Sequence, residues 1–239
     1  MTTLVLSTRN QHKIGEIRAI LQESFRYLTL DDFPTARHIV EDAQSFAGNA
    51  TKKAVQLAEW LAPMPGESMI SKTAQASAEG VFVLADDSGL EVDALGGAPG
   101  VHSARFAALD SRASSNSPDA ENNAKLLRLL EDVPWPDRTA RFRCVIALTP
   151  ILAPRSQNAS PVCLANEFEL QTRIFEGKCE GRIALSASGQ NGFGYDPLFV
   201  PDGFERSFAE LSNSTKNQIS HRARALLKLG DYLRQIDGA

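Results

Sequence analysis

The sequence is poor in cysteine, which argues against two ways of stabilising a domain. Only Cys144, Cys163 and Cys179 occur in 239 residues, and no two of them form a CxxC pair. An odd number of widely spaced cysteines is a poor match to a disulfide framework or a structural zinc site. We therefore expect an ordinary hydrophobic core, which a chain of this length can bury.

Long apolar runs and an excess of positive charge are also missing. No run approaches the roughly 20 apolar residues of a membrane span, and the start, MTTLVLSTRNQHK, lacks the apolar core of a signal peptide. We therefore predict a cytoplasmic protein that does not bind membranes. The 25 basic residues are outnumbered by 29 acidic ones, a formal net charge of −4, so we do not expect general binding to nucleic acid. A local site for a small anion is compatible with this charge.

Strand and helix patterns alternate along the chain, which is typical of the α/β class. Short apolar or alternating runs predict strands at residues 4–6, 81–85, 142–148, 168–174 and 198–200. Apolar residues at helical spacing predict helices directly after Asn10, over 45–61, over 118–131, and from about Ser220. Segments rich in proline and small residues predict surface loops without chemistry at about 62–80 and 149–165.

The segment Ser7–Lys13 follows the first predicted strand with hydroxyls and an amide, just before a helix. Such a turn exposes backbone N–H groups and the positive end of the helix dipole, and Lys13 lies one turn inside the helix. No GxxxxGK[ST] motif occurs, so a phosphate site here would not be a Walker motif. The alternative is an ordinary N-cap with solvated Arg9 and Lys13.

Asp86 and Asp87 are predicted to end an apolar strand, and Ser88 and Gly89 follow them. Burying carboxylates is costly unless a cation or donors compensate, and open α/β sheets bind ligands at the carboxyl ends of strands. Gly89 indicates a turn that brings backbone close to a ligand. An Asp-rich turn is the alternative, but an acidic pair after an apolar strand favours a functional site.

Glu41 and Asp42 precede the helix predicted over 45–61. A carboxylate from this pair could join Asp87 in holding Mg²⁺, an ion that prefers oxygen ligands and keeps several waters. Taken alone, the two acidic residues are better explained as stabilising the helix N-terminus.

Two later segments are also candidates for a ligand site. Ser188–Pro197 combines three glycines with Phe193 and Tyr195, either of which could stack on a base; a plain glycine-rich hairpin is the alternative. Ser220 is a suitable N-cap that places His221 and Arg222 in a first helical turn, where the dipole disfavours cations. A local rule broken in this way is expected at functional sites, although a lone histidine is more often structural.

The chain resembles the inosine/xanthosine triphosphate pyrophosphatases from Leu4 to about Leu233. The resemblance lies in the order and combination of six segments: STRNQHK, SFAGNATKKA, LADDSGLEVDALGGAPGVHSARFA, GFGYDPLFVP, FAELS and KNQISHRARAL. It implies one domain over residues 1–239, with two lobes around an elongated mixed β-sheet and the active-site cleft between the lobes. It also implies a homodimer and Mg²⁺-dependent hydrolysis of ITP, dITP or XTP to the nucleoside monophosphate and pyrophosphate.

The resemblance further implies roles for single residues. Asp87 would be the catalytic proton acceptor, and Glu41 and Asp87 would associate with Mg²⁺. The implied contacts on the phosphate side are Thr8, Arg9, Asn10, Gln11, His12, Lys13, Asn49, Lys53 and Ser88. Those on the base side are Phe193, Gly194, Tyr195, Asp196, Lys216, His221 and Arg222, with Phe193 as the stacking residue.

Base discrimination has a simple physical hypothesis. Donors from His221 or Arg222 that face the C6 keto oxygen of hypoxanthine or xanthine would meet the amino group of adenine donor to donor. A pyrophosphatase for modified pyrimidine or thymidine-type triphosphates is the rival enzyme, and a nucleotide-binding regulator without turnover is the rival from another class. Asp86 and Asp87 argue against a pure binder, because extra negative charge repels a polyanion.

Overall fold

The computed structural model describes residues 1–37, 39–62, 80–110, 116–152 and 166–237. Its strands are β1 (Thr3–Leu6), β2 (Arg26–Thr29), β3 (Val81–Val92), β4 (Thr139–Pro150), β5 (Arg173–Ile183) and β6 (Phe199–Pro201). Its α-helices are α1 (Gln11–Leu21), α2 (Phe46–Leu61), α4 (Asp119–Leu129), α5 (Glu167–Gln171), α6 (Asn213–Ile219) and α7 (His221–Asp237). Short 3₁₀ turns lie at Gln22–Ser24, Leu30–Asp32, Asp93–Leu95, Gly100–Arg105, Ala107–Asp110 and Trp135–Asp137.

The strands form one mixed sheet in the order β2-β1-β3-β4-β5-β6. Strand β1 runs parallel to both β2 and β3, whereas β5 and β6 are antiparallel. Leu4, Val5 and Leu6 are fully buried, as expected for a parallel strand that is covered on both faces. The predicted α/β class with a mixed sheet is therefore confirmed.

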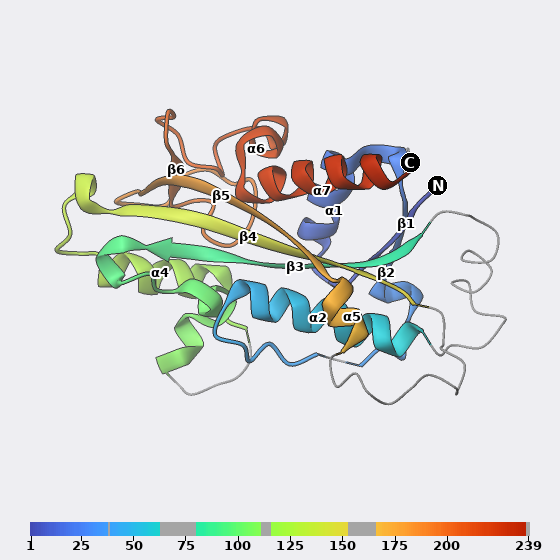
Figure 1. Cartoon of the computed structure of the whole chain (residues 1–239). Coiled ribbons are helices and arrows are strands. Elements are labelled where there is room, and N and C mark those ends of the chain that lie inside the picture. Colours follow the sequence, from blue (N-terminus) through green and yellow to red (C-terminus); the bar gives the residue numbers. More distant parts are fainter. Residues whose placement is uncertain (38, 63–79, 111–115, 153–165, 238–239) are drawn as a thin grey trace. The chain divides into compact units, whose positions relative to one another are not determined.

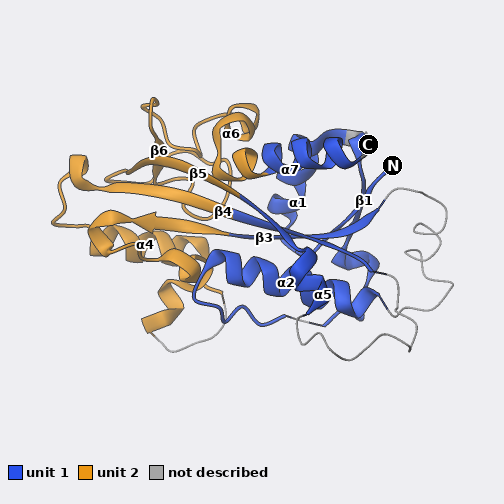
Figure 2. Cartoon of the chain, viewed as in Figure 1, with its two compact units in different colours: residues 1–87, 145–175, 226–239 blue, residues 88–144, 176–225 orange. Residues whose placement is uncertain are grey.

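The chain divides into two compact units (Figure 2). Unit 1 comprises Met1–Asp87, Val145–Phe175 and Leu226–Ala239, and unit 2 comprises Ser88–Cys144 and Glu176–Ala225. In unit 1, α1 and α7 lie on one side of the strands, and α2 and α5 lie on the other (Figure 1). The core of unit 2 contains a group of aromatic rings, in which Phe142 packs against Phe199 and Phe208 at centroid distances of 4.7 and 6.1 Å. A single domain over residues 1–239 and a cleft between two lobes both stay predictions.

Most of the predicted elements are confirmed with small shifts in their ends. The helix predicted over 45–61 is α2, whose N-cap Ser45 accepts a hydrogen bond from the N–H of Gly48 at 3.1 Å. The helix predicted over 118–131 is α4, which begins directly after Pro118. None of the described helices combines the length and apolarity that a membrane span requires.

The prediction that β3 ends at the acidic pair is wrong. Strand β3 continues from Val81 through Asp86, Asp87 and Gly89 to Val92, so Gly89 makes no turn. The strand can continue because neighbouring side chains point to opposite faces and each carboxylate meets a lysine from a different helix.

The strand predicted over 168–174 is also wrong in its first half, which forms helix α5. The carboxamide oxygen of Asn166 caps this helix by accepting from the N–H groups of Phe168 and Glu169 at 3.0 and 3.3 Å. Strand β5 begins only at Arg173. Strand β2 and helix α6 were not predicted, because each is too short to show a clear period.

The predicted surface loops fall largely outside the described residues, as does Cys163. Within the described part, Thr149 and Pro150 belong to β4 rather than to a loop, because Thr149 is buried and its hydroxyl is 2.8 Å from that of Thr172. Cys144 and Cys179 are both buried.

Candidate active site

The turn between β1 and α1 is shaped by its own side chains. The carboxamide oxygen of Asn10 accepts from the N–H groups of His12 and Lys13 at 3.0 and 3.2 Å, and the hydroxyl of Thr8 accepts from the N–H of Asn10 at 3.1 Å. Asn10 is therefore the N-cap of α1, but Lys13 is not solvated as the N-cap alternative expected, because it is paired with Asp86. The side chains of Arg9, Gln11 and His12 are exposed, so an anion at this turn would meet side chains as well as backbone.

Two lysines meet the acidic pair from opposite faces of the sheet. Lys13 of α1 forms an ion pair with Asp86, and the Nζ of Lys53 on α2 lies 3.3 Å from Oδ1 of Asp87. Lys53 also donates to the backbone carbonyl of Asp86 at 2.7 Å. Asp86 and Asp87 are only 2% and 7% exposed, so these lysines supply compensation that buried carboxylates require.

The segment before α2 adds a third carboxylate to the group. Oε2 of Glu41 lies 3.2 Å from the Nζ of Lys53, so Glu41 and Asp87 share one ammonium. The side chain of Asn49 helps to hold this segment, because its buried Oδ1 accepts from the N–H of Ala43 at 2.9 Å. Asp42 instead pairs with Lys52 at 2.5 Å and is well exposed.

Burial and charge set the proton affinity of this group. Burial raises the pKa of Asp87 to about 6, against the opposing effect of Lys53 and Lys13, and the neighbouring Glu41 and Asp86 raise it further. Burial also works to raise the pKa of Glu41, but Lys53 outweighs it and the pKa lies below its usual value. Burial lowers the pKa of Lys53, yet Asp87 and Glu41 outweigh it and hold that pKa above its ordinary value.

The charges of this group are suited to a divalent cation. Two lysines and three carboxylates give +2 − 3 = −1 when all are ionised, and Oδ2 of Asp87 is buried without a hydrogen-bond partner in the described part of the chain. The described residues contain no cluster of three or more His, Cys, Asp or Glu side chains that could enclose a metal. Mg²⁺, however, is commonly held by one or two carboxylates together with water and substrate phosphates, and Glu41 and Asp87 fit that kind of site.

In unit 2, a buried ion pair organises the glycine-rich segment. Oδ2 of Asp196 accepts from the Nζ of Lys216 at 2.6 Å and from the N–H of Phe193 at 2.9 Å. Asp196 and Lys216 are 2% and 3% exposed. Gly192 has a φ of +76°, and a Cβ there would lie 2.0 Å from Oδ2 of Asp196. The segment is therefore a loop folded tightly around one carboxylate.

The two aromatic residues of this loop have different surroundings. The ring of Phe193 is half-buried, with the Nζ of Lys216 at 4.9 Å and the Cζ of Arg222 at 5.8 Å from its centroid. Tyr195 is 3% exposed, lies in the core of unit 2 and donates its hydroxyl to the carbonyl of Ser103 at 2.9 Å. The ring of Phe193 is therefore only partly covered, whereas the ring of Tyr195 belongs to the core of unit 2.

The first turn of α7 packs closely against β5. A Cβ at Gly177 would lie 2.1 Å from the carbonyl oxygen of His221, so only glycine allows this approach. The imidazole of His221 is buried and stacks on Phe142 at 4.7 Å, with 13° between the planes. The hydroxyl of Ser220 accepts from the N–H of Ala223 at 3.1 Å, which confirms the predicted N-cap.

Arg222 is 1% exposed and connects this turn to β3. Its Nη2 donates to the hydroxyl of Ser88 at 2.8 Å. Ser88 follows Asp87 directly in the chain. Asp87 belongs to unit 1 and Ser88 to unit 2, so the carboxylate group and the contact of Arg222 are adjacent in sequence along β3.

Each unit thus gathers part of the predicted site. Unit 1 brings together Lys13, Glu41, Lys53, Asp86 and Asp87. Unit 2 brings together Ser88, Phe193, Asp196, Lys216 and Arg222. Sequence reasoning missed Asp119 and Asn123 of α4, which both contact the backbone of Gly194. The doublet Asn122-Asn123 in a predicted helix was an available signal, because asparagine is a poor helix former.

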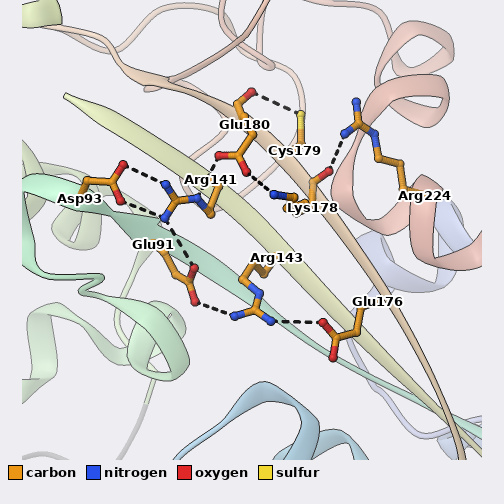
Figure 3. A network of polar contacts seen from close by, with 9 residues as sticks. All are labelled: Glu91, Asp93, Arg141, Arg143, Glu176, Lys178, Cys179, Glu180 and Arg224. Carbon is orange, nitrogen blue, oxygen red and sulfur yellow. Dashed lines mark hydrogen bonds and ion pairs between the residues drawn. The ribbon is translucent and has the colours of Figure 1, made fainter. Parts of the chain in front are cut away.

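The arginines of β4 do not offer a second anion site. Arg141 forms a bidentate pair with Asp93 at 2.9 Å and also binds Glu180 at 2.9 Å (Figure 3). Arg143 is paired with Glu91 and Glu176 at 3.3 and 3.2 Å. These guanidinium groups are neutralised by carboxylates on β3, on β5 and on the 3₁₀ turn that follows β3, so this network stabilises unit 2 rather than attracting phosphate.

The chain is similar to known proteins in both sequence and fold. Residues 4–232 match the Ham1 family. A dITP/XTP pyrophosphatase of Desulforamulus reducens is 41% identical over 98% of this chain and 96% of its own length, and one of Geobacter sulfurreducens is 42% identical over 98% and 97%. The solved structure of a HAM1 protein from Coxiella burnetii has a TM-score of 0.72 and 34% identity, covering 98% of this chain and 100% of that chain.

Proposed function

Because the chain belongs to the Ham1 family, we propose that it hydrolyses dITP, XTP and ITP to the nucleoside monophosphate and pyrophosphate. It is a nucleoside triphosphate pyrophosphatase, as its relatives' names describe. The observation that carries the proposal is the group around Lys53, whose Nζ lies 3.3 Å from Oδ1 of Asp87 and 3.2 Å from Oε2 of Glu41. Asp87 is buried, and its Oδ2 has no hydrogen-bond partner in the described part of the chain, so this carboxylate is suited to accept a proton as a general base.

The phosphate chemistry belongs to the residues of unit 1. Asp87 accepts a proton from the water that attacks the α-phosphorus, and pyrophosphate leaves. Lys13 and Lys53 hold the acidic pair in place. The two lysines and the N-terminal turn of α1 also offset the negative charge of the triphosphate. Held by Glu41 and Asp87, Mg²⁺ would supply the remaining positive charge at the phosphates.

The base is recognised by the residues of unit 2. Phe193 provides the stacking surface, and the donors of Arg222 and His221 face the C6 keto oxygen of hypoxanthine or xanthine. Adenine presents an amino donor at that position, so it leaves buried donors without acceptors and is rejected. A buried, Ser88-bound Arg222 is suited to this role, because its guanidinium is held in one orientation.

A panel of nucleotides tests the proposal directly. Purified protein is incubated with ITP, dITP, XTP, ATP, GTP, dUTP and dTTP, with Mg²⁺ or with a chelator, and pyrophosphate is measured separately from orthophosphate. We expect pyrophosphate from ITP, dITP and XTP only with Mg²⁺, and little from ATP. Preference for dUTP or dTTP would support the rival pyrimidine enzyme, and tight binding without turnover would support a regulator.

We also infer that the protein forms a homodimer, as the family resemblance implies. Sedimentation equilibrium would give twice the mass of one chain, and a single-chain mass at working enzyme concentrations would contradict the inference.

A further inference from the structure

Two neighbouring asparagines of α4 hold different backbone segments of unit 2. Asn122 and Asn123 are both buried. Oδ1 of Asn122 accepts from the N–H of Ala107 at 2.8 Å, and its amide nitrogen lies 3.4 Å from the carbonyl of Ala104. Nδ2 of Asn123 instead donates to the carbonyl of Gly194 at 3.0 Å. The two side chains are chemically identical but fasten different parts of the unit.

The residue Gly194 is held at both of its backbone polar groups. Oδ2 of Asp119 accepts from the N–H of Gly194 at 2.6 Å, while Asn123 donates to its carbonyl. Asp119 and Asn123 are four residues apart on α4 and therefore share one helix face. Gly194 has a φ of +63°, so a particular left-handed backbone conformation is fixed directly after Phe193.

Phe193 is consequently clamped from two sides. Its own N–H is held by Asp196, which is paired with Lys216, and the residue after it is held by α4. The first clamp consists of residues already placed on the base side, whereas Asp119 and Asn123 lie on a helix that otherwise packs in the core through Leu126.

The side-chain amide of Asn123 uses only its Nδ2 donor in hydrogen bonding. Oδ1 of Asn123 is buried and has no hydrogen-bond partner in the described part of the chain. A buried oxygen without a partner is unfavourable, and an apolar side chain of similar size would avoid that cost. The favourable contact that an amide makes here is the hydrogen bond from Nδ2 to Gly194.

We propose that Asn123 and Asp119 are positioning residues that hold Gly194 and thereby orient the ring of Phe193 for base selection. The inference rests on the proposed function. Neither residue touches the nucleotide; both act through the backbone of the loop. We call the hydrogen bonds from Asp119 and Asn123 to Gly194 the clamp. Loosening the clamp weakens binding of the base and lets adenine compete better. The residues that hold Asp87 in unit 1 are not affected.

The test uses Asn123→Ala, Asp119→Ala and the conservative Asp119→Asn, with Asn122→Ala as the matched control. Each alanine variant of the clamp is expected to raise the KM for ITP about tenfold, close to one hydrogen bond's net contribution, with kcat changed less than about threefold. The ratio of kcat/KM for ITP over ATP should fall in parallel. Asp119→Asn keeps an acceptor for the Gly194 N–H and should restore the KM.

Thermal unfolding of all four variants separates positioning from general damage. Asn122→Ala is expected to lower the melting temperature but to leave the KM and the ITP/ATP ratio close to those of the wild type. Because Asp119 is exposed, its substitution perturbs Gly194 with little effect on folding. If the clamp variants behave like Asn122→Ala, the positioning role is wrong although the proposed function stands. If the wild-type protein releases no pyrophosphate from ITP, both are overturned.

Discussion

Replacing Asp87 by asparagine is expected to stabilise the fold and remove most of the turnover. The pKa of this carboxyl rises from 3.8 to about 6 on folding, so its ionised form is less favourable in the folded chain. One pKa unit corresponds to about 1.36 kcal/mol, which makes the cost roughly 3 kcal/mol at pH 7. Asparagine has nearly the same shape and no charge. Lys53 keeps Glu41 at 3.2 Å and the Asp86 carbonyl at 2.7 Å, so we expect a net gain of about 1–3 kcal/mol.

The gain should depend on pH with a definite sign. Well below the unfolded pKa of 3.8, Asp87 is protonated in both states and contributes nothing. As the pH rises from there to about 6, the unfolded chain has lost the proton and the folded chain still holds it. The unfolded state then binds fewer protons, so this carboxyl makes the stability of the wild type fall with rising pH, and the asparagine variant lacks that fall.

The assay is urea unfolding over this pH range, in chelator and without nucleotide, combined with the release of pyrophosphate from ITP in Mg²⁺. The variant should be more stable than the wild type at pH 7, with the difference shrinking toward about pH 4, and turnover should drop by about 10²–10⁴. Asp42→Asn is the control, because that exposed carboxylate pairs only with Lys52 among the contacts described. A variant less stable than the wild type at pH 7 would refute the electrostatic reasoning, and near-normal turnover would remove Asp87 from the mechanism.

Three further predictions concern unit 2. His221→Ala should lower ITP turnover more than any residual ATP turnover, measured as kcat/KM; an equal loss on both would show that His221 does not read the base. Lys216→Met removes the ammonium that pairs with buried Asp196 and should lower the free energy of unfolding by about 3–5 kcal/mol, measured by urea unfolding. Lys52→Met, which breaks the exposed pair with Asp42, should lower it by less than about 1 kcal/mol. Similar losses in the two variants would contradict the role of burial. Gly177→Ala should displace the first turn of α7 and lower both the melting temperature and ITP affinity, and an unchanged melting temperature would show that the turn has room to move.

Apolar spacing and capping residues predicted much of the secondary structure, because both act between residues that are close together in the chain. The apolar run Leu4–Leu6 predicted a buried strand, apolar spacing predicted the helix over 45–61, and Ser220 predicted a helix start through capping. The patterns failed where tertiary contacts overrode them. The segment 168–174 alternates apolar and polar residues as a strand does, but capping by Asn166 stabilises its first half as helix α5. Strand β3 continues through Asp86 and Asp87 because each carboxylate is paired with a lysine.

The sequence by itself determined which chemical groups the protein has and the order in which they occur: an acidic pair after an apolar run, a lysine on each of two helices, and a glycine-rich loop with aromatic rings. Only the tertiary structure decided their partners. It made Glu41 rather than Asp42 the neighbour of Lys53, placed Tyr195 in the core, and set Asn123 against Gly194. The physical reason is that burial, ion pairing and hydrogen bonding depend on distances between residues far apart in the chain, and these distances exist only once the sheet and its helices have packed.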